Sequence, residues 1–309
     1  MMLLYTDPRF LLHETGSHPE CAERLHHITR ELETTGLVGK CTQPTWEPAG
    51  DEAILRVHHS TLTAQLQRLA TQGGGRVDPD TVVSPQSFEI AKLAAGAVCD
   101  ATQQILAGTA NRALCLVRPP GHHALADRAM GFCLLNDIAV AAQAALDSGV
   151  DRLLVVDWDV HHGNGTQACF YDEPRVGFFS AHRWPFYPGT GSAEETGTGD
   201  GLGTTRNLPV EFGTSRETYR QEFARELEDF AARIKPELVL VSAGFDSHRL
   251  DPIGSLGLEV EDFSWLTTTV TDIANTYAKG RVVSTLEGGY NPPVLAECVA
   301  AHLEALQDT

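Results

Sequence analysis

The sequence predicts an α/β protein built on an open, mostly parallel β-sheet with helices on both faces. Short apolar runs with the length and β-branched content of buried strands recur along the chain. Longer segments between them carry apolar residues at three-to-four spacing, as on one face of a helix. This alternation of strand and helix is the pattern of a parallel sheet covered on both faces. Because the 309-residue chain has no composition break or low-complexity linker, residues 1–309 are expected to form one domain.

The expected elements follow one another along the chain. Residues 18–70 are mostly helical by pattern and are expected to pack on one side of the sheet. Two glycine-rich segments, Gly73–Gly75 and Gly189–Gly203, are predicted to be long loops within the domain. The predicted strands are Ala113–Val117, Leu153–Val156, Val176–Ser180, Leu238–Ser242 and Val282–Leu286. The predicted helices are Ser87–Leu106, Asn136–Ser148, Ser215–Ile234 and Glu261–Lys279.

The composition is that of an acidic globular protein, with a formal net charge of −18 and 42% hydrophobic residues. Such a charge would repel phosphates, so direct nucleic acid binding is not expected, whereas cationic substrates would be tolerated. The seven cysteines are scattered, which favours reduced thiols over disulfides or a thiolate zinc site. The amino terminus is too short for a signal sequence before a charge arrives at Asp7. No run approaches the roughly 18 apolar residues of a membrane span, so a cytoplasmic protein is expected.

The segment 157–165 reads Asp-Trp-Asp-Val-His-His-Gly-Asn-Gly and follows the predicted strand Leu153–Val156. In open α/β sheets, ligands bind at the carboxyl ends of the strands. Side chains at i, i+2 and i+4 of an extended segment share one face, so Asp157, Asp159 and His161 converge. Two carboxylates and an imidazole on one face form half of a divalent-metal site. The alternative is a solvated turn with scattered polar residues.

Polar, glycine-flanked residues of catalytic types follow the other predicted strands as well. A parallel sheet would bring all of these strand ends to one edge, where they could form a single site. The segments are Arg118–Ala124, Ala181-His182 leading to Tyr187–Gly191, Ala243–His248 and Glu287–Tyr290.

Asp159, His161 and Asp246 are the predicted ligands of a catalytic metal ion. They would supply three N or O ligands and leave one position open for water or substrate, which is the arrangement of catalytic zinc. A structural zinc would use four ligands, usually with thiolates, and the sequence offers none in register. Two alternatives remain open: Asp246 could instead cap the N-terminus of a helix, and His248 could compete with it as a ligand.

His122 and His123 are the candidate acid–base pair, and they follow a rigid Pro-Pro-Gly turn. Histidine titrates near neutrality and suits proton transfer from a metal-activated water and to a leaving amine. Each ring needs an orienting acceptor, for which Asp157 and Asn164 are the candidates. Tyr290, after two glycines, could donate a hydrogen bond to an oxyanion opposite the metal, or it could be an ordinary interfacial tyrosine.

Together these residues resemble those of the histone deacetylase superfamily, in particular its class II branch and bacterial relatives. The resemblance extends from His18-Pro19-Glu20 to the tyrosine turn Glu287–Tyr290, which is most of the chain. The segments that match in order and spacing are Arg118–Ala124, Gly131-Phe132-Cys133 with Asn136, Asp157–Thr166, Ser242–Asp246 and the tyrosine turn. The family implies an arginase-like α/β fold with a mostly parallel sheet of about eight strands. It also implies zinc-dependent hydrolysis of an N-acyl amide, usually acetyl-lysine.

The resemblance assigns a role to each predicted site residue. It implies that one zinc ion is bound by Asp159, His161 and Asp246. The residues it implies for catalysis are His122 and His123 as the acid–base pair, Asp157 and Asn164 as their orienters, and Tyr290 as the oxyanion donor. The residues it implies for substrate binding are Gly131, which would accept the substrate amide, Phe132 and Tyr187 as tunnel walls, Asp80 at the rim and Ile253 at the mouth.

Three further features follow from the resemblance. Arg24 resembles an arginine of the family's interior channel. Some relatives have aspartate where this chain has Asn164, so His123 should be less basic here than in those relatives. Family members also bind a structural potassium ion, and the residues implied for it here, mostly through carbonyl groups, are Asp157, Asp159, His161, Ser180 and Ala181.

Three other functions compete with deacylation of lysine side chains in a protein or a small molecule. An acetylpolyamine amidohydrolase shares the mechanism, but polyamine-selective relatives can place a glutamate at the tunnel mouth where this sequence has Ile253. An arginase-type ureohydrolase shares the fold but needs a two-manganese ligand set that the sequence does not show. A non-catalytic acyl-lysine-binding scaffold would have lost a metal ligand or Tyr290, and the full set is present.

Overall fold

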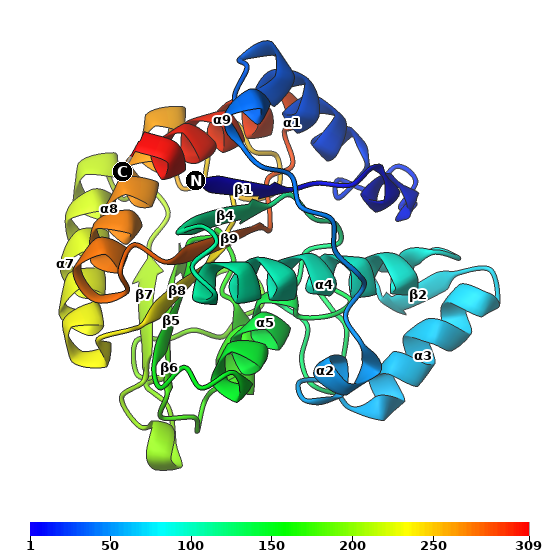
Figure 1. Ribbon diagram of the computed structural model, residues 1–309, viewed down its shortest axis with the longest axis horizontal. Coiled ribbons are helices and arrows are strands. Elements are labelled where there is room, and N and C mark those ends of the chain that lie inside the picture. The colour runs from blue at the N-terminus through cyan, green and yellow to red at the C-terminus, as the bar shows by residue number, and fades with distance from the viewer. Residues whose placement is uncertain (309) are drawn as a thin grey trace.

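The centre of the fold is a seven-stranded sheet in which every neighbouring pair of strands is parallel (Figure 1). The computed structural model describes residues 1–308. The strand order is β1-β4-β9-β8-β5-β6-β7. The strands are β1 (Met2–Tyr5), β4 (Arg112–Cys115), β5 (Leu153–Asp157), β6 (Val176–Arg183), β7 (Thr205–Val210), β8 (Leu238–Ala243) and β9 (Val282–Leu286). A separate antiparallel pair consists of β2 (Gly75–Asp78) and β3 (Thr81–Val83).

Helices cover both faces of the sheet. The α-helices are α1 (Glu23–Thr34), α2 (Asp51–Leu55), α3 (Ser60–Thr71), α4 (Ser87–Leu106), α5 (Asp137–Asp147), α6 (Asn164–Cys169), α7 (Arg216–Ile234), α8 (Val260–Tyr277) and α9 (Pro292–Asp308). Three short 3₁₀ helices are η1 (Pro8–Leu12), η2 (Val38–Lys40) and η3 (Gly199–Gly201). α4 and α5 pack together on one face, and α9 packs between α1 and α8 on the other (Figure 1).

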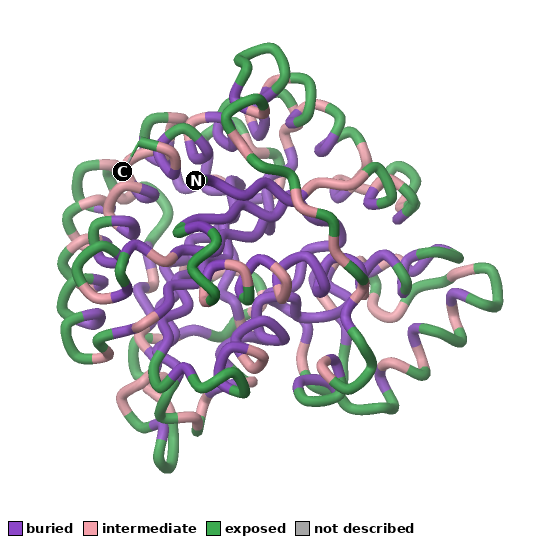
Figure 2. The backbone as a smooth tube through the Cα atoms, in the orientation of Figure 1, coloured by how far each residue is buried: buried purple, intermediate pink, exposed green. Residues whose placement is uncertain are grey.

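The five strands expected from the sequence are the five adjacent central strands of the sheet, β4, β9, β8, β5 and β6. Four of them are buried along their whole length, and only the last residue of β6 is partly exposed (Figure 2). Parallel strands covered on both faces are expected to be continuously apolar, as these are. Because neighbouring strands run in the same direction, the segments that follow them all leave at one edge of the sheet.

The α/β fold class is confirmed, with seven strands in the sheet in place of about eight. The long helices expected between the strands are present as α4, α5, α7 and α8, and residues 18–70 hold α1, α2 and α3. Both edge strands, β1 and β7, and the last helix, α9, were not expected. β7 reads Thr-Arg-Asn-Leu-Pro-Val. An edge strand tolerates polar residues and proline, so β7 is not an apolar run and was not predicted as a strand.

Candidate active site

The three predicted metal ligands come together at the carboxyl edge of the sheet. One ligand atom from each of Asp159, His161 and Asp246 lies within 4.8 Å of the others, and all three residues are buried. Nδ1 of His161 is 3.1 Å from Oδ1 of Asp159 and 3.2 Å from Oδ2 of Asp246. That Asp246 oxygen is buried, accepts no well-aligned hydrogen bond among residues 1–308, and faces the imidazole of His161. Two buried carboxylates that face one imidazole are costly unless a cation balances their charge, so this set fits a metal ion.

The two alternatives for this position do not match the geometry. Asp246 precedes no helix until α8 begins at Val260, and its Oδ1 instead accepts the backbone N–H of Val160, 2.9 Å away. His248 turns away from the cluster, because its Nε2 lies 3.5 Å from the carboxylate of Glu259. Trp158 and Val160 are buried in the hydrophobic core, as the alternation along the segment predicts.

The two histidines of the doublet lie side by side, with ring centroids 4.0 Å apart. Nδ1 of His122 is 2.9 Å from Oδ2 of Asp157, and Nδ1 of His123 is 2.7 Å from Oδ1 of Asn164. The predicted acceptors are therefore the observed ones. An amide oxygen and a carboxylate both accept, so each Nδ1 carries a proton and donates it. His122 also approaches the metal cluster, with its Nε2 3.9 Å from Oδ1 of Asp159.

Burial and neighbouring charges shift the pKa values of the two histidines in opposite directions. Burial alone would lower the pKa of His122, but Asp157, Asp159 and Glu287 outweigh it and raise that pKa to about 10. Burial and the positive charges of His122 and His161 lower the pKa of His123 well below its usual value. Two adjacent imidazoles thus favour different protonation states, as an acid–base pair requires.

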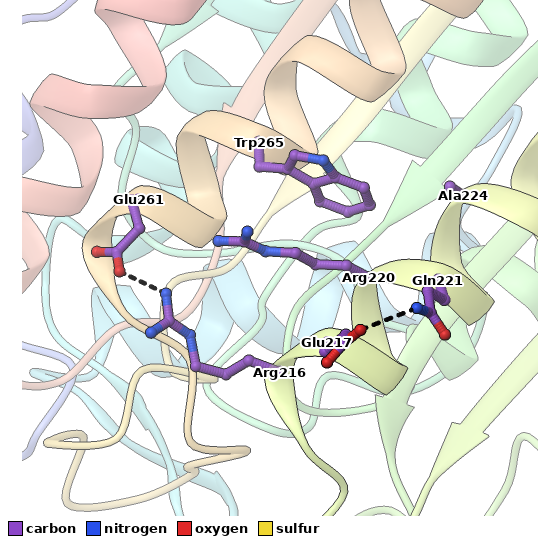
Figure 3. A pocket seen from close by; sticks show the side chains of 7 residues that line it. All are labelled: Arg216, Glu217, Arg220, Gln221, Ala224, Glu261 and Trp265. Atoms are coloured by element: carbon purple, nitrogen blue, oxygen red, sulfur yellow. Dashed lines mark hydrogen bonds and ion pairs between the residues drawn. The ribbon is translucent and has the colours of Figure 1, made fainter.

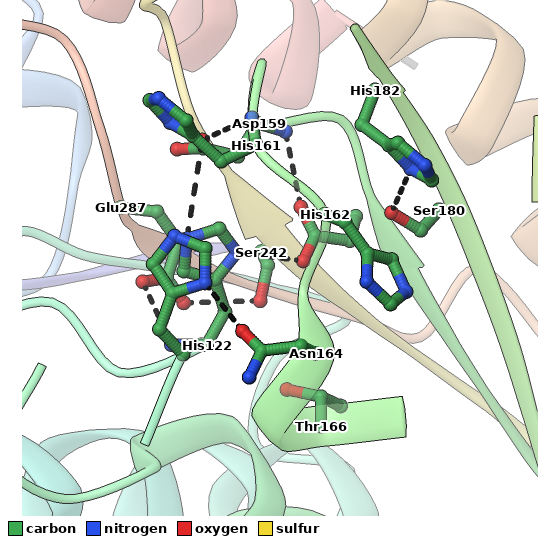
Figure 4. A network of polar contacts seen from close by, with 12 residues as sticks. His122, Asp159, His161, His162, Asn164, Thr166, Ser180, His182, Ser242 and Glu287 are labelled. Carbon is green, nitrogen blue, oxygen red and sulfur yellow. Dashed lines mark hydrogen bonds and ion pairs between the residues drawn. The ribbon is translucent and has the colours of Figure 1, made fainter. Parts of the chain in front are cut away.

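Glu287 joins the histidine loop, Arg118–Ala124, to the tyrosine turn. Its Oε2 accepts the backbone N–H groups of Gly121, at 2.8 Å, and His122, at 3.2 Å. Its Oε1 accepts the hydroxyl of Ser242 (Figure 4). On the other side of the turn, Arg24 donates to the carbonyl oxygens of Glu287 and Gly289. The Arg24 guanidinium carbon also lies 5.1 Å from the centre of the Tyr290 ring.

The predicted tunnel residues surround this centre with aromatic rings. Phe132 meets the ring of Tyr290 edge-on at 5.5 Å, and Tyr187 meets the ring of His123 edge-on at 5.2 Å. Gly131 has a φ of +56°, and a Cβ at this position would collide with the ring of His123. Phe132 follows with a φ of +69°, an uncommon conformation for a non-glycine residue. Its backbone N–H donates to the Thr81 hydroxyl over 3.1 Å.

The two predicted mouth residues, Asp80 and Ile253, lie in two different loops and are not members of the metal cluster. Asp80 is half-buried between β2 and β3, and its Oδ1 accepts the hydroxyl of Thr81, which in turn holds Phe132. Burial and the nearby Asp78 raise the pKa of Asp80. Ile253 is partly buried in the loop after β8, and its backbone N–H donates to Asp251.

The five residues predicted for potassium lie on β5, on β6 and in the segment that follows β5. Asp157 is the register partner of Ser180 in the sheet, and Ala181 follows Ser180 on the buried β6 strand. The Ser180 hydroxyl lies 2.9 Å from Nδ1 of His182, which makes the hydroxyl part of a hydrogen-bond network (Figure 4).

A groove of about 680 Å³ lies elsewhere, between α7 and α8, and contains none of the predicted site residues (Figure 3). Its two arginines are already paired with acidic groups, Arg216 with Glu261 and Asp262, and Arg220 with Asp262.

Among the residues that hold the site in place, Glu287, Phe186 and Glu20 were not predicted from the sequence. Glu287 follows a strand like the predicted residues, so the same signal could have pointed to its role. Phe186 stacks on the ring of His161 at 5.2 Å, and no pattern in the sequence indicates that contact. Glu20 is completely buried and binds Arg24, four positions later in the chain, and Arg118, which only the folded chain brings to it.

A parallel α/β sheet whose carboxyl edge carries a buried N/O cluster beside two histidines defines an α/β protein with a candidate metal-dependent catalytic centre. Comparison with known proteins agrees: the histone deacetylase domain matches residues 18–306. The chain therefore belongs to the histone deacetylase family. This membership supports a deacetylase or amidohydrolase function.

Individual relatives cover nearly the whole chain. A histone deacetylase-like amidohydrolase of Pseudomonas aeruginosa is 39% identical over 94% of this chain and 77% of its own. A probable deacetylase of Archaeoglobus fulgidus is 38% identical over 91% of this chain and 79% of its own. The crystal structure of the HDA15 HD domain is similar with a TM-score of 0.94 at 34% identity, covering 99% of this chain and 91% of that one. Among residues 1–308, none of the helices combines the length and apolarity that a membrane crossing requires.

Proposed function

We propose that this chain is a zinc-dependent amidohydrolase that removes acetyl or related acyl groups from lysine side chains. The observation that carries the proposal is the buried cluster of Asp159, His161 and Asp246 beside the paired His122 and His123. Two carboxylates and one imidazole are a suitable set for one catalytic zinc with an open position. Structural zinc would instead close its shell with a fourth protein ligand.

The residues around the cluster divide the chemistry among them. Zinc bound by the three ligands would polarise the amide carbonyl and lower the pKa of a water molecule. His123, neutral and held by Asn164, accepts the proton of the attacking water and then returns it to the leaving amine. His122, held positive by Asp157, stabilises the negative charge that develops. The Tyr290 hydroxyl donates to the oxyanion as the carbonyl carbon becomes tetrahedral.

The proposal extends to the surroundings of the centre. Phe132 and Tyr187 wall the path of the acyl-lysine chain, Gly131 accepts the substrate amide, and Asp80 grips the substrate backbone at the rim. A structural potassium ion is bound, mostly through carbonyl groups, by Asp157, Asp159, His161, Ser180 and Ala181. The whole reaction is carried out within one domain that comprises residues 1–309.

The second candidate substrate is an acetylated polyamine. The acidic protein, with a net charge of −18, would attract such a cation. Ile253 favours the lysine substrate, because an apolar side chain at this position supplies no carboxylate for a second ammonium group.

A substrate panel tests the proposal. Zinc-loaded protein is assayed with acetyl-, trifluoroacetyl- and longer acyl-lysine peptides beside acetylated putrescine and spermidine. We expect turnover of an acyl-lysine peptide, loss of turnover on chelation, and a fall in kcat of about a hundredfold in Tyr290→Phe, the scale of losing one oxyanion donor. Preference for the polyamines would select the second candidate, and no turnover of any amide would refute both.

A further inference from the structure

The tyrosine turn is held in place through its backbone. The Gly288 N–H donates to Oδ2 of Asp159 over 2.8 Å, and the carbonyl of Gly289 accepts from Arg24 over 2.7 Å. At the tyrosine itself, the backbone N–H of Tyr290 donates to Oδ2 of Asp251 over 2.6 Å. This last contact is short and involves a charged acceptor, which makes it one of the stronger kinds of hydrogen bond.

The other oxygen of the same carboxylate organises the loop that carries Ile253. Oδ1 of Asp251 accepts the backbone N–H groups of Ile253, at 2.9 Å, and Gly254, at 3.0 Å. This loop is in turn tied to the metal cluster, because the N–H of Ser255 donates to the carbonyl of Asp246 over 2.7 Å. One half-buried carboxylate therefore connects the Ile253 loop to the tyrosine turn.

We propose that Asp251 is a positioning residue that aims the Tyr290 hydroxyl at the substrate carbonyl. The inference rests on the proposed function, since it requires that Tyr290 acts on the substrate. Asp251 touches no reacting atom and acts only by fixing the backbone from which the phenol projects. A displacement of the tyrosine by a fraction of an ångström weakens an oxyanion donor, so loss of this anchor lowers kcat more than it changes KM.

The substitution Asp251→Asn distinguishes the roles of the two carboxylate oxygens, because it replaces one of them and leaves the other. Asparagine retains one carbonyl oxygen, which can keep accepting from Ile253 and Gly254. Its amide group then replaces the oxygen that faces Tyr290 and sets a donor against a donor. The variant thus keeps the hydrogen bonds that organise the Ile253 loop and loses the hydrogen bond to the backbone N–H of Tyr290.

A double-mutant cycle between Asp251→Asn and Tyr290→Phe tests this assignment, because groups that act as a unit have non-additive effects. We expect Asp251→Asn to lower kcat about tenfold in the otherwise unchanged protein and less than about twofold in the Tyr290→Phe background. A loss in the first background at least five times that in the second supports the proposal, and any smaller ratio overturns it. Asp7→Asn is the matched control, since Asp7 also accepts a backbone N–H, that of Arg9, at 2.8 Å.

A second measurement does not depend on activity. The protein has six tyrosines, so labelling tyrosine with ¹⁵N gives few amide signals, and that of Tyr290 is the one missing from ¹⁵N-tyrosine-labelled Tyr290→Phe. We expect this amide in the unsubstituted protein to exchange slowly with solvent and to resonate downfield. Exchange as fast as that of an exposed amide overturns the proposal even if the enzyme is active. Absence of all amide turnover with this amide still protected would instead refute the proposed function.

Discussion

At the residue scale, the histidine pair shows how two identical side chains come to different roles. His122 donates to a carboxylate and His123 to a neutral amide, and both rings are buried. The carboxylate of Asp157 balances a charge on His122, whereas Asn164 offers His123 orientation without charge. We therefore propose His123 as the proton acceptor of the pair, with a basicity that depends on the residue at position 164.

Asn164→Asp tests this dependence. A new carboxylate at the position now 2.7 Å from Nδ1 favours the charged form and should raise the pKa of His123 by about one unit or more. Because the neutral form is the active one, the acid limb of the kcat/KM profile should move to higher pH. Asn275→Asp is the control, since it adds the same charge beside Arg112 at the opposite edge of the sheet. An unchanged acid limb in Asn164→Asp would remove His123 from the role of proton acceptor.

At the scale of elements, the turn between β5 and α6 sets the distance between the metal ligands and the histidines. Gly163 lies in this turn, and a Cβ there would collide with the Oδ2 of Asp157 that His122 binds. The φ of Gly163 is −74°, so the requirement for glycine comes from this close approach and not from the backbone conformation.

We expect Gly163→Ala to push Asp157 away from His122 and to lower kcat by roughly tenfold or more, with a stability loss of about 1–3 kcal/mol from overpacking. Gly39→Ala is the matched control, because a Cβ at Gly39 meets nothing within 4 Å. Steady-state kinetics and urea denaturation of both variants measure the two effects. Equal activity of the two variants would mean that the Asp157 contact does not matter for turnover.

A buried ion cluster joins three other segments of the chain. Glu20 precedes α1, and its carboxylate lies 2.5 Å from Arg118 and 3.2 Å from Arg24. Arg118 leads into the histidine loop, and Arg24 donates to the tyrosine turn. Burial alone would raise the pKa of Glu20, but Arg118, His13 and Arg24 outweigh it and lower that pKa to about 2.

Removing the Glu20 charge leaves buried cations without a partner. We expect Glu20→Gln to lower the free energy of unfolding by about 3–5 kcal/mol at neutral pH. Glu173→Gln, which breaks the exposed pair with Arg175, should cost less than about 1 kcal/mol. Urea denaturation of both variants gives the two values, and a loss in Glu20→Gln as small as that in Glu173→Gln would contradict the account.

The same cluster predicts a dependence of stability on pH. A carboxyl whose pKa is lowered on folding contributes stability above its unfolded value, here 4.5, and loses it as the pH falls toward about 2. The difference in unfolding free energy between the unsubstituted protein and Glu20→Gln should therefore narrow across that interval. A constant difference from pH 5 to pH 2 would show that the Glu20 charge is not the cause.

At the scale of the whole molecule, the sequence predicts the central strands of the sheet better than its edge strands and the separate hairpin. The central strands are continuous apolar runs, so the segments that follow them could be assigned to one edge of a sheet. Asp159, His161 and Asp246 were predicted in this way to lie close together, although the first and the last are 87 positions apart in the sequence. The edge strand β7 and the hairpin of β2 and β3 are short or polar, so their residues give no such signal.

The contacts that support the site could not be predicted from the sequence, for a different reason. Glu20, Asp251 and Glu287 act through the backbone N–H groups or buried cations of residues far away in the chain. No spacing rule relates a carboxylate to such partners, because the partner is fixed only when the strands have their order in the sheet. Those carboxylates nevertheless determine where His122 and Tyr290 point.

The central claim is that one zinc ion is held by three side chains with its fourth position open. Anomalous diffraction at the zinc edge from crystals of the zinc-loaded protein tests it most directly. We expect one peak per chain, about 2.0–2.2 Å from Nδ1 of His161 and from an oxygen of each of Asp159 and Asp246, with no fourth protein ligand. A peak elsewhere, or a fourth protein donor that closes the shell, would contradict the account.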